Sequence, residues 1–91
     1  MSSDETQAAL SRAYELVEAG RQDAARAVLE PLLAREPNNA AIWWIYAHAV
    51  TTPEEGLQAL ERVVRIDPNY PGAAELIAIA EERYPAQTQL P

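Results

Sequence analysis

The stretch REPNNAAIWWIYAHA, residues 35–49, contains the end of one helix and the start of the next. Pro37 disfavours helical geometry in the residue before it, so a helix is predicted to end there. Asn38 and Asn39 then offer side-chain oxygens to the free amides of a helix that begins at Ala40. Proline and asparagine therefore separate two helices.

A similar stretch, RIDPNYPGAAELIAIA, returns at residues 65–80. Pro37 and Pro68 lie 31 residues apart, and each is preceded by an acid and followed by asparagine. Small residues also recur at comparable places in the predicted helices. Because small side chains let two helices cross closely, this recurrence indicates a repeat. These residues are Ala13, Ala25, Ala47, Gly56 and Ala78. The chain is predicted to repeat a hairpin of two helices.

Helix-forming residues fill the segments between these breaks, and no segment shows the sustained alternation typical of a strand. The five predicted helices cover residues 4–19, 22–35, 40–51, 53–66 and 71–84. Ser2 and Glu5 are expected to form a capping box at the first helix, and Gly20 is expected to end it in a left-handed conformation.

Two further helix starts are predicted from turn residues. Thr52 is expected to cap the fourth helix, with Pro53 at the first helical position and Glu55 placed to complete a capping box. Asn69 is expected to cap the fifth helix, with Pro71 in its first turn.

The predicted fold class is all-α, an α-solenoid of antiparallel helix hairpins with about two and a half units. Residues 1–84 are expected to form this single domain, since a chain of 91 residues is too short for more. Residues 85–91, PAQTQLP, lack an apolar face and are expected to form a flexible tail or linker.

The sequence resembles the tetratricopeptide repeat family, whose unit is a pair of antiparallel helices of about 34 residues. The resemblance covers roughly residues 6–84. It rests on Gly20, Ala25, the run from Glu36 to Asn39, Trp43 with Ala47, Leu57, Leu60, Val63 and the second stretch IDPNY. The second unit is three residues shorter than the first, and Ala9 and Arg12 stand where the family has larger apolar groups.

Periodicity divides the third helix into two faces. Trp43, Tyr46, Ala47 and Val50 lie three or four residues apart and are predicted to face the core. Trp44 is turned about 100° from Trp43 and belongs to another stripe.

The resemblance implies that the first helices of successive units line a concave groove that holds a peptide or helix. The groove is expected to be mainly apolar and aromatic. Its residues would be Leu10, Tyr14, Val17, Trp44, His48, Glu75 and Ile79. The alternative is that Trp44 and Tyr14 pack against each other and close the core of a small domain.

The net charge of −7, with seven arginines and no lysine, makes nucleic acid an unfavourable partner. The longest apolar stretch is too short to span a bilayer, and the polar, acidic start does not resemble a secretory signal. A cytoplasmic protein is therefore expected. The absence of cysteine excludes disulfides and thiolate metal sites.

No enzymatic function, cofactor or metal site is predicted. His48 is the only histidine, no nucleophile is placed beside a base, and the three glycines form no phosphate-binding loop. The predicted function is a non-enzymatic module that binds an apolar or helical peptide segment, with a basic flank complementary to the acidic chain. The alternative is a structural module that forms a homodimer through its repeat ends, its groove or helix exchange.

Overall fold

The computed structural model describes residues 4–83, and every regular element in this range is an α-helix. The five helices are α1 (Asp4–Glu18), α2 (Gln22–Arg35), α3 (Ala40–Ala49), α4 (Pro53–Ile66) and α5 (Ala73–Arg83). The predicted all-α fold class is confirmed, with the expected number of helices in this range. The capping role of Ser2 and the tail over residues 85–91 concern parts of the chain outside it.

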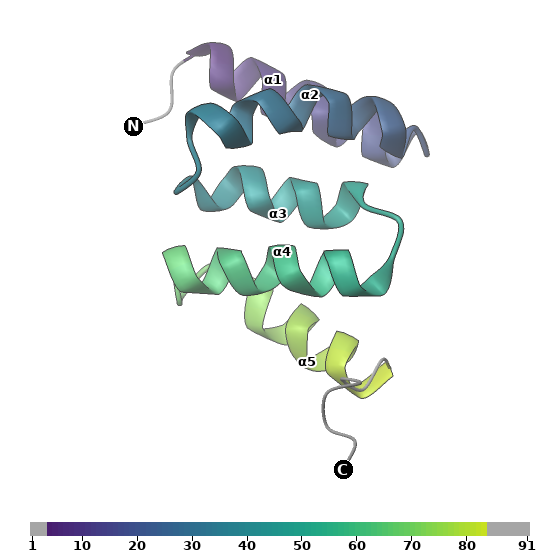
Figure 1. The fold of residues 1–91 in the computed structure, drawn as a ribbon, viewed down its shortest axis with the longest axis vertical. Coiled ribbons are helices and arrows are strands. Elements are labelled where there is room, and N and C mark those ends of the chain that lie inside the picture. Colours follow the sequence, from purple (N-terminus) through teal and green to yellow (C-terminus); the bar gives the residue numbers. More distant parts are fainter. Residues whose placement is uncertain (1–3, 84–91) are drawn as a thin grey trace.

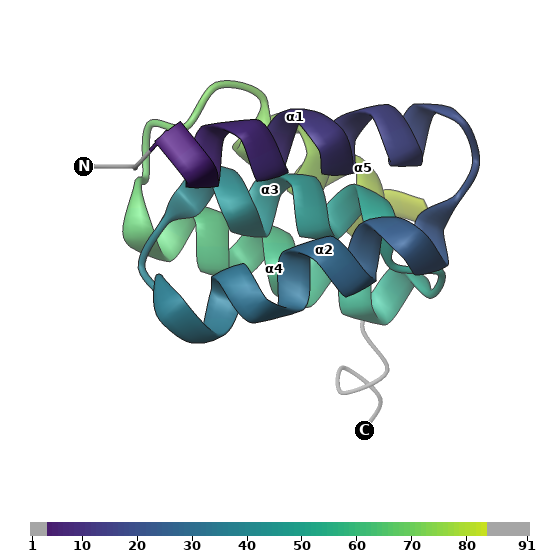
Figure 2. The same cartoon turned by 90° about the horizontal axis from the view of Figure 1, so that it is seen from above.

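The helices stack as consecutive antiparallel neighbours along the long axis of the molecule (Figure 1). Helix α3 is central, because it packs on α1, α2 and α4. Helix α5 packs on α4 and diverges from it toward its C-terminal end (Figure 1). Seen from above, α1, α3 and α5 lie toward one side and α2 and α4 toward the other (Figure 2). The first helices of the hairpins therefore share one face of the molecule.

Gly20 ends α1 in the left-handed conformation, as predicted, with φ of 78°. The Arg21 amide donates a hydrogen bond to the Leu16 carbonyl oxygen at 2.8 Å. The Gly20 amide donates to the Val17 carbonyl oxygen at 3.0 Å. Together these bonds form a Schellman motif, which satisfies carbonyl groups that the end of the helix leaves free.

Asn39 and Thr52 cap α3 and α4 as predicted, but the Glu55 carboxylate accepts from the Thr52 hydroxyl and not from the Thr52 backbone amide that a capping box uses. The Ala41 amide donates to Oδ1 of Asn39 at 3.1 Å. At α4, the Glu55 amide donates to Oγ1 of Thr52 at 3.3 Å, and the Thr52 hydroxyl donates to the Glu55 carboxylate at 2.9 Å. Both caps use side chains within three residues of the amide that they satisfy, so short-range sequence was enough to predict them.

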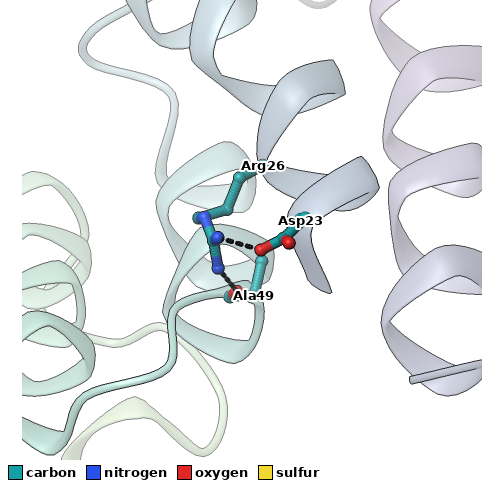
Figure 3. Close-up of polar contacts among 3 residues, drawn as sticks. All are labelled: Asp23, Arg26 and Ala49. Carbon is teal, nitrogen blue, oxygen red and sulfur yellow. Dashed lines mark hydrogen bonds and ion pairs between the residues drawn. The ribbon is translucent and has the colours of Figure 1, made fainter. Parts of the chain in front are cut away.

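Helix α3 ends at Ala49, two residues before the predicted end, and Val50 is extended. Arg26 of α2 reaches this end, where its Nη1 donates to the Ala49 carbonyl oxygen at 2.8 Å (Figure 3). Arg26 also forms an ion pair with Asp23, one turn earlier on α2. A cation at the C-terminal end of a helix is favourable because the free carbonyl groups there carry partial negative charge.

The predicted start of α5 is wrong. The helix begins at Ala73, after Gly72, which has a φ of 84°. A residue with positive φ cannot belong to a right-handed helix, so Pro71 lies in a turn before the helix. Asn69 does not act as the predicted cap. Its amide donates to Oδ1 of Asp67 at 3.1 Å, within the preceding turn.

The face of α3 that is buried in the core is not the predicted face. Ile42 and Ala49 are completely buried, whereas Trp43, Tyr46 and Ala47 of the predicted face, and Val50 just beyond the helix, are half-buried. Helix α3 is apolar on almost all sides because α1, α2 and α4 surround it, so one stripe does not define its buried face. The other residues of the core are Leu10, Ala13, Ala25, Leu29 and Leu32, together with Ala59, Leu60, Val63 and Ala73.

Trp43 lies at the edge of this core. Its Nε1 donates to the Pro37 carbonyl oxygen at 2.8 Å, and the Arg62 guanidinium lies 5.2 Å from the centroid of its ring. The ring of Tyr46 meets it edge-on with centroids 6.0 Å apart. The indole N–H needs an acceptor, and the half-buried position provides one.

Helix α5 has little cover. Of its residues 73–82, only Ala73 is fully buried, and Ile79 is 48% exposed. Ala78, at the place of the buried Ala13, is exposed because the described chain places no second helix of a third hairpin beside α5. The described array is therefore open at α5.

Candidate functional site

Two clefts lie along the first helices of the hairpins. The first, between α1 and α3, has a volume of about 330 Å³. Its lining residues are Tyr14, Val17, Glu18, Trp44, Ile45 and His48. The second, between α3, α4 and α5, has a volume of about 370 Å³ and is mainly apolar. His48 lines both clefts and forms the ridge between them.

The first cleft contains four of the seven predicted groove residues: Tyr14, Val17, Trp44 and His48. The second contains Ile79 together with His48. Glu75 is exposed on α5 and lines neither of these two clefts. The prediction for Leu10 is wrong, because Leu10 is 6% exposed and belongs to the core. Leu10 packs in the buried cluster with Ala13 of α1 and Leu29 of α2.

Trp44 is held by aromatic neighbours. The centroid of its ring lies 5.3 Å from that of Tyr70 and 4.9 Å from that of His48. Its Cη2 atom also approaches Gly72 at the start of α5. Trp44 is therefore a packing residue as well as a wall of the first cleft. The alternative that it packs on Tyr14 is not what the structure shows, since Tyr14 is 53% exposed and lies with Trp44 along the wall of a cleft.

His48 makes a hydrogen bond of 2.8 Å between Nδ1 and the Trp44 carbonyl oxygen, one turn earlier on α3. A carbonyl oxygen only accepts, so Nδ1 carries the proton and, in the neutral ring, Nε2 is an acceptor. Among residues 4–83, no group of three or more histidine, aspartate, glutamate or cysteine residues is placed to hold a metal ion. His48 is therefore a polar residue between the two clefts, and its Nε2 atom remains available to accept a hydrogen bond.

Tyr14 and Glu18 are coupled across one turn of α1. A side-chain hydrogen bond with Glu18, and to a lesser degree the negative charge of that carboxylate, raise the pKa of Tyr14 above its ordinary value. Both causes favour the neutral phenol of Tyr14. Tyr70, which contacts Trp44 from the turn before α5, also has a raised pKa, mainly because it is half-buried and partly because of the negative charge of Asp67.

Sequence reasoning missed Glu18, Ile45 and Tyr70. Glu18 lies four residues after Tyr14, and this spacing places both on one face of a helix, so the signal was present. Ile45 is adjacent to Trp44 and lines the cleft because α1 lies close to two faces of α3. Tyr70 precedes α5 and belongs to no periodic pattern, so only the fold reveals its contact with Trp44.

Stacked antiparallel helix pairs, with clefts along the first helix of each pair, define an α-helical repeat protein. In comparison with known families, residues 6–49 match the family model of the tetratricopeptide repeat. The match begins in α1 and ends with α3, so it supports a tetratricopeptide repeat over these residues, and α4 and α5 follow as two further helices. Neither a curated protein nor a solved structure matches the chain.

Tetratricopeptide repeats generally mediate protein–protein interaction and are typically not enzymes. None of the helices between residues 4 and 83 has the length and apolar character that crossing a bilayer requires.

Proposed function

We propose that the protein binds an apolar or helical segment of another protein across the two clefts beside His48. The observation that carries this proposal is that Tyr14 and Ile79, the most exposed large apolar side chains in the described range, each line one of these clefts. Exposed apolar surface in a concave site is typical of a contact surface. A helix carrying residues at spacings of three and four would fill two adjacent clefts with one stripe.

The charge of the chain favours a partner with a basic flank. The net charge is −7, and acidic side chains lie at and near the clefts: Glu18 in the first cleft and Glu75 on the exposed surface of α5. Complementary charge speeds association and selects among partners more than it increases affinity. Binding of such a partner should therefore weaken and slow as salt concentration rises.

The test is selection of helical peptides from a display library, followed by affinity measurement with Tyr14→Ala and Ile79→Ala. Both side chains are exposed, so their removal should leave helicity unchanged. We expect enrichment of peptides with an apolar stripe, and an affinity loss of about tenfold or more for each variant. Gln58→Ala, an exposed change on α4 away from both clefts, should bind as the wild type does. Selected peptides that bind all four proteins equally would contradict the proposal.

Self-association is a second candidate, favoured by the exposure of α5. Ile79 and Ala78 would be covered if α5 met the same helix of another copy. Against it, Glu75, Glu81 and Glu82 would bring like charges together in such a pair. Light scattering after size-exclusion chromatography tests this candidate. A mass of 10.0 kDa at every concentration would eliminate it.

A further inference from the structure

We infer that the cleft between α1 and α3 binds the guanidinium group of an arginine side chain on the partner segment. This inference rests on the proposed function, because the arginine belongs to the segment that the two clefts are proposed to hold. The inference adds one positively charged contact to a binding surface that is otherwise described as apolar.

The lining of the cleft provides the two kinds of contact that a guanidinium group uses. Tyr14 and Trp44 contribute aromatic rings, and Glu18 contributes the carboxylate. A guanidinium group stacks on aromatic faces and donates paired hydrogen bonds to a carboxylate. Val17 and Ile45 add apolar surface, against which the three methylene groups of an arginine side chain would pack, and His48 is the remaining lining residue.

The charge of Glu18 is not neutralised within the described range. The one ion pair of residues 4–83 joins Arg26 to Asp23 on α2, and the lining of the cleft contains no arginine. Glu18 follows Tyr14 by four residues, so its carboxylate lies on the same face of α1 as the Tyr14 ring. The Glu18 side chain is exposed, so it is accessible to a guanidinium group that enters the cleft.

Arginine fits this lining better than the other charged groups. A carboxylate or phosphate would meet Glu18 without a compensating lysine or arginine in the cleft. A lysine ammonium would pair with Glu18, but it is strongly hydrated and makes no planar stack on a ring. The planar, weakly hydrated guanidinium group uses both the rings and the carboxylate.

The experiment uses two blocked helical peptides of about 15 residues, a length that gives roughly four turns. Both carry the same leucine stripe, and they differ only in one position, which is arginine in the first and citrulline in the second. Citrulline keeps the planar shape and removes the charge. Affinities for both peptides are measured by calorimetry with the wild type, Glu18→Gln and Glu15→Gln. Glu15 is an exposed acid of the same helix outside the cleft, so its variant makes the same charge change without touching the site.

We expect the arginine peptide to bind the wild type about tenfold more tightly than the citrulline peptide, which corresponds to one charge-assisted contact. The preference should fall to about twofold or less in Glu18→Gln and remain in Glu15→Gln. Equal affinity of the two peptides for the wild type overturns the inference and leaves the proposed function intact. A preference that survives Glu18→Gln also overturns it.

If neither peptide binds, the proposed function fails, and N-acetyl-arginine amide decides the inference alone. Chemical-shift changes of the Tyr14 and Trp44 rings in the wild type, reduced in Glu18→Gln, would support the arginine site. Their absence at millimolar concentrations would overturn it.

Discussion

The indole ring of Trp44 lies against Gly72, with its Cη2 atom 3.3 Å from the position that a Cβ atom on residue 72 would occupy. Trp44 belongs to α3, and Gly72 immediately precedes α5. The ring also contacts Tyr70, so the turn before α5 is packed on one side chain of α3. This contact explains how α5, most of whose residues are exposed, is positioned in the array.

We predict that Gly72→Ala destabilises the protein more than Gly20→Ala does. Both glycines have positive φ, so alanine should cost about 1–2 kcal/mol at either site for its backbone conformation. At residue 72 the added Cβ must also displace the Trp44 ring by a few tenths of an ångström, whereas at residue 20 it meets no atom within 4 Å. We expect an additional loss of about 1 kcal/mol at residue 72.

Urea unfolding of the two variants measures this difference, and Gly20→Ala is the control for the backbone contribution. Equal losses in unfolding free energy would show that Trp44 moves aside at no cost, contrary to the prediction.

Arg26→Ala should lower the unfolding free energy by about 1–2 kcal/mol, since it removes the hydrogen bond to the Ala49 carbonyl oxygen. The partner Asp23 is 92% exposed, and an exposed ion pair contributes little, so Asp23→Asn should change stability by less than about 0.5 kcal/mol. Thermal or urea unfolding of both variants distinguishes the two contacts. If Asp23→Asn lowers the unfolding free energy as much as Arg26→Ala does, the ion pair with Asp23 stabilises the protein more than the hydrogen bond to the Ala49 carbonyl oxygen.

Thr52→Ala should cost about 1 kcal/mol, because the Glu55 amide loses its acceptor at the first turn of α4. Thr51, its exposed neighbour, has no capping role at α4, so Thr51→Ala is the matched control. Chemical denaturation of both variants measures the contribution of the Thr52 cap to the unfolding free energy. Similar losses for Thr52→Ala and Thr51→Ala would contradict the prediction.

The parts of the fold that could be predicted are those determined by short-range chemistry. Gly20, Asn39 and Thr52 act through bonds to residues within a few positions, so their types were sufficient. The start of α5 could not be predicted in this way, because the conformation of Gly72 accompanies a contact with Trp44, far away in the sequence.

The candidate site shows the same division. The resemblance to the tetratricopeptide repeat placed Tyr14, Val17, Trp44 and His48 in one groove, and these four residues line one cleft. Spacing alone did not show that Leu10 turns inward, since this depends on how α1 sits over α2 and α3.

Stability should depend on pH through Glu36, which joins the first turn of α1 to the turn before α3. Its carboxylate accepts hydrogen bonds from the Thr6 hydroxyl at 2.6 Å and from Nδ2 of Asn39 at 3.2 Å. These bonds, the one from Thr6 first, lower the pKa of Glu36 below its ordinary value of 4.5. A carboxyl group with a lower pKa in the folded state stabilises that state at pH above its ordinary value. This contribution is lost as the pH falls from there through the lowered pKa.

Glu36→Gln removes this titration while keeping an oxygen that accepts from Thr6. We therefore expect the wild type to exceed the variant in unfolding free energy at pH 7, and the difference to shrink as the pH falls below about 4.5. Glu30→Gln, an exposed change on α2, controls for the loss of one negative charge from an acidic protein. Urea unfolding between pH 3 and pH 7 measures all three proteins. A difference between wild type and Glu36→Gln that stays constant over this range would mean that the two hydrogen bonds do not favour the charged carboxylate in the folded protein.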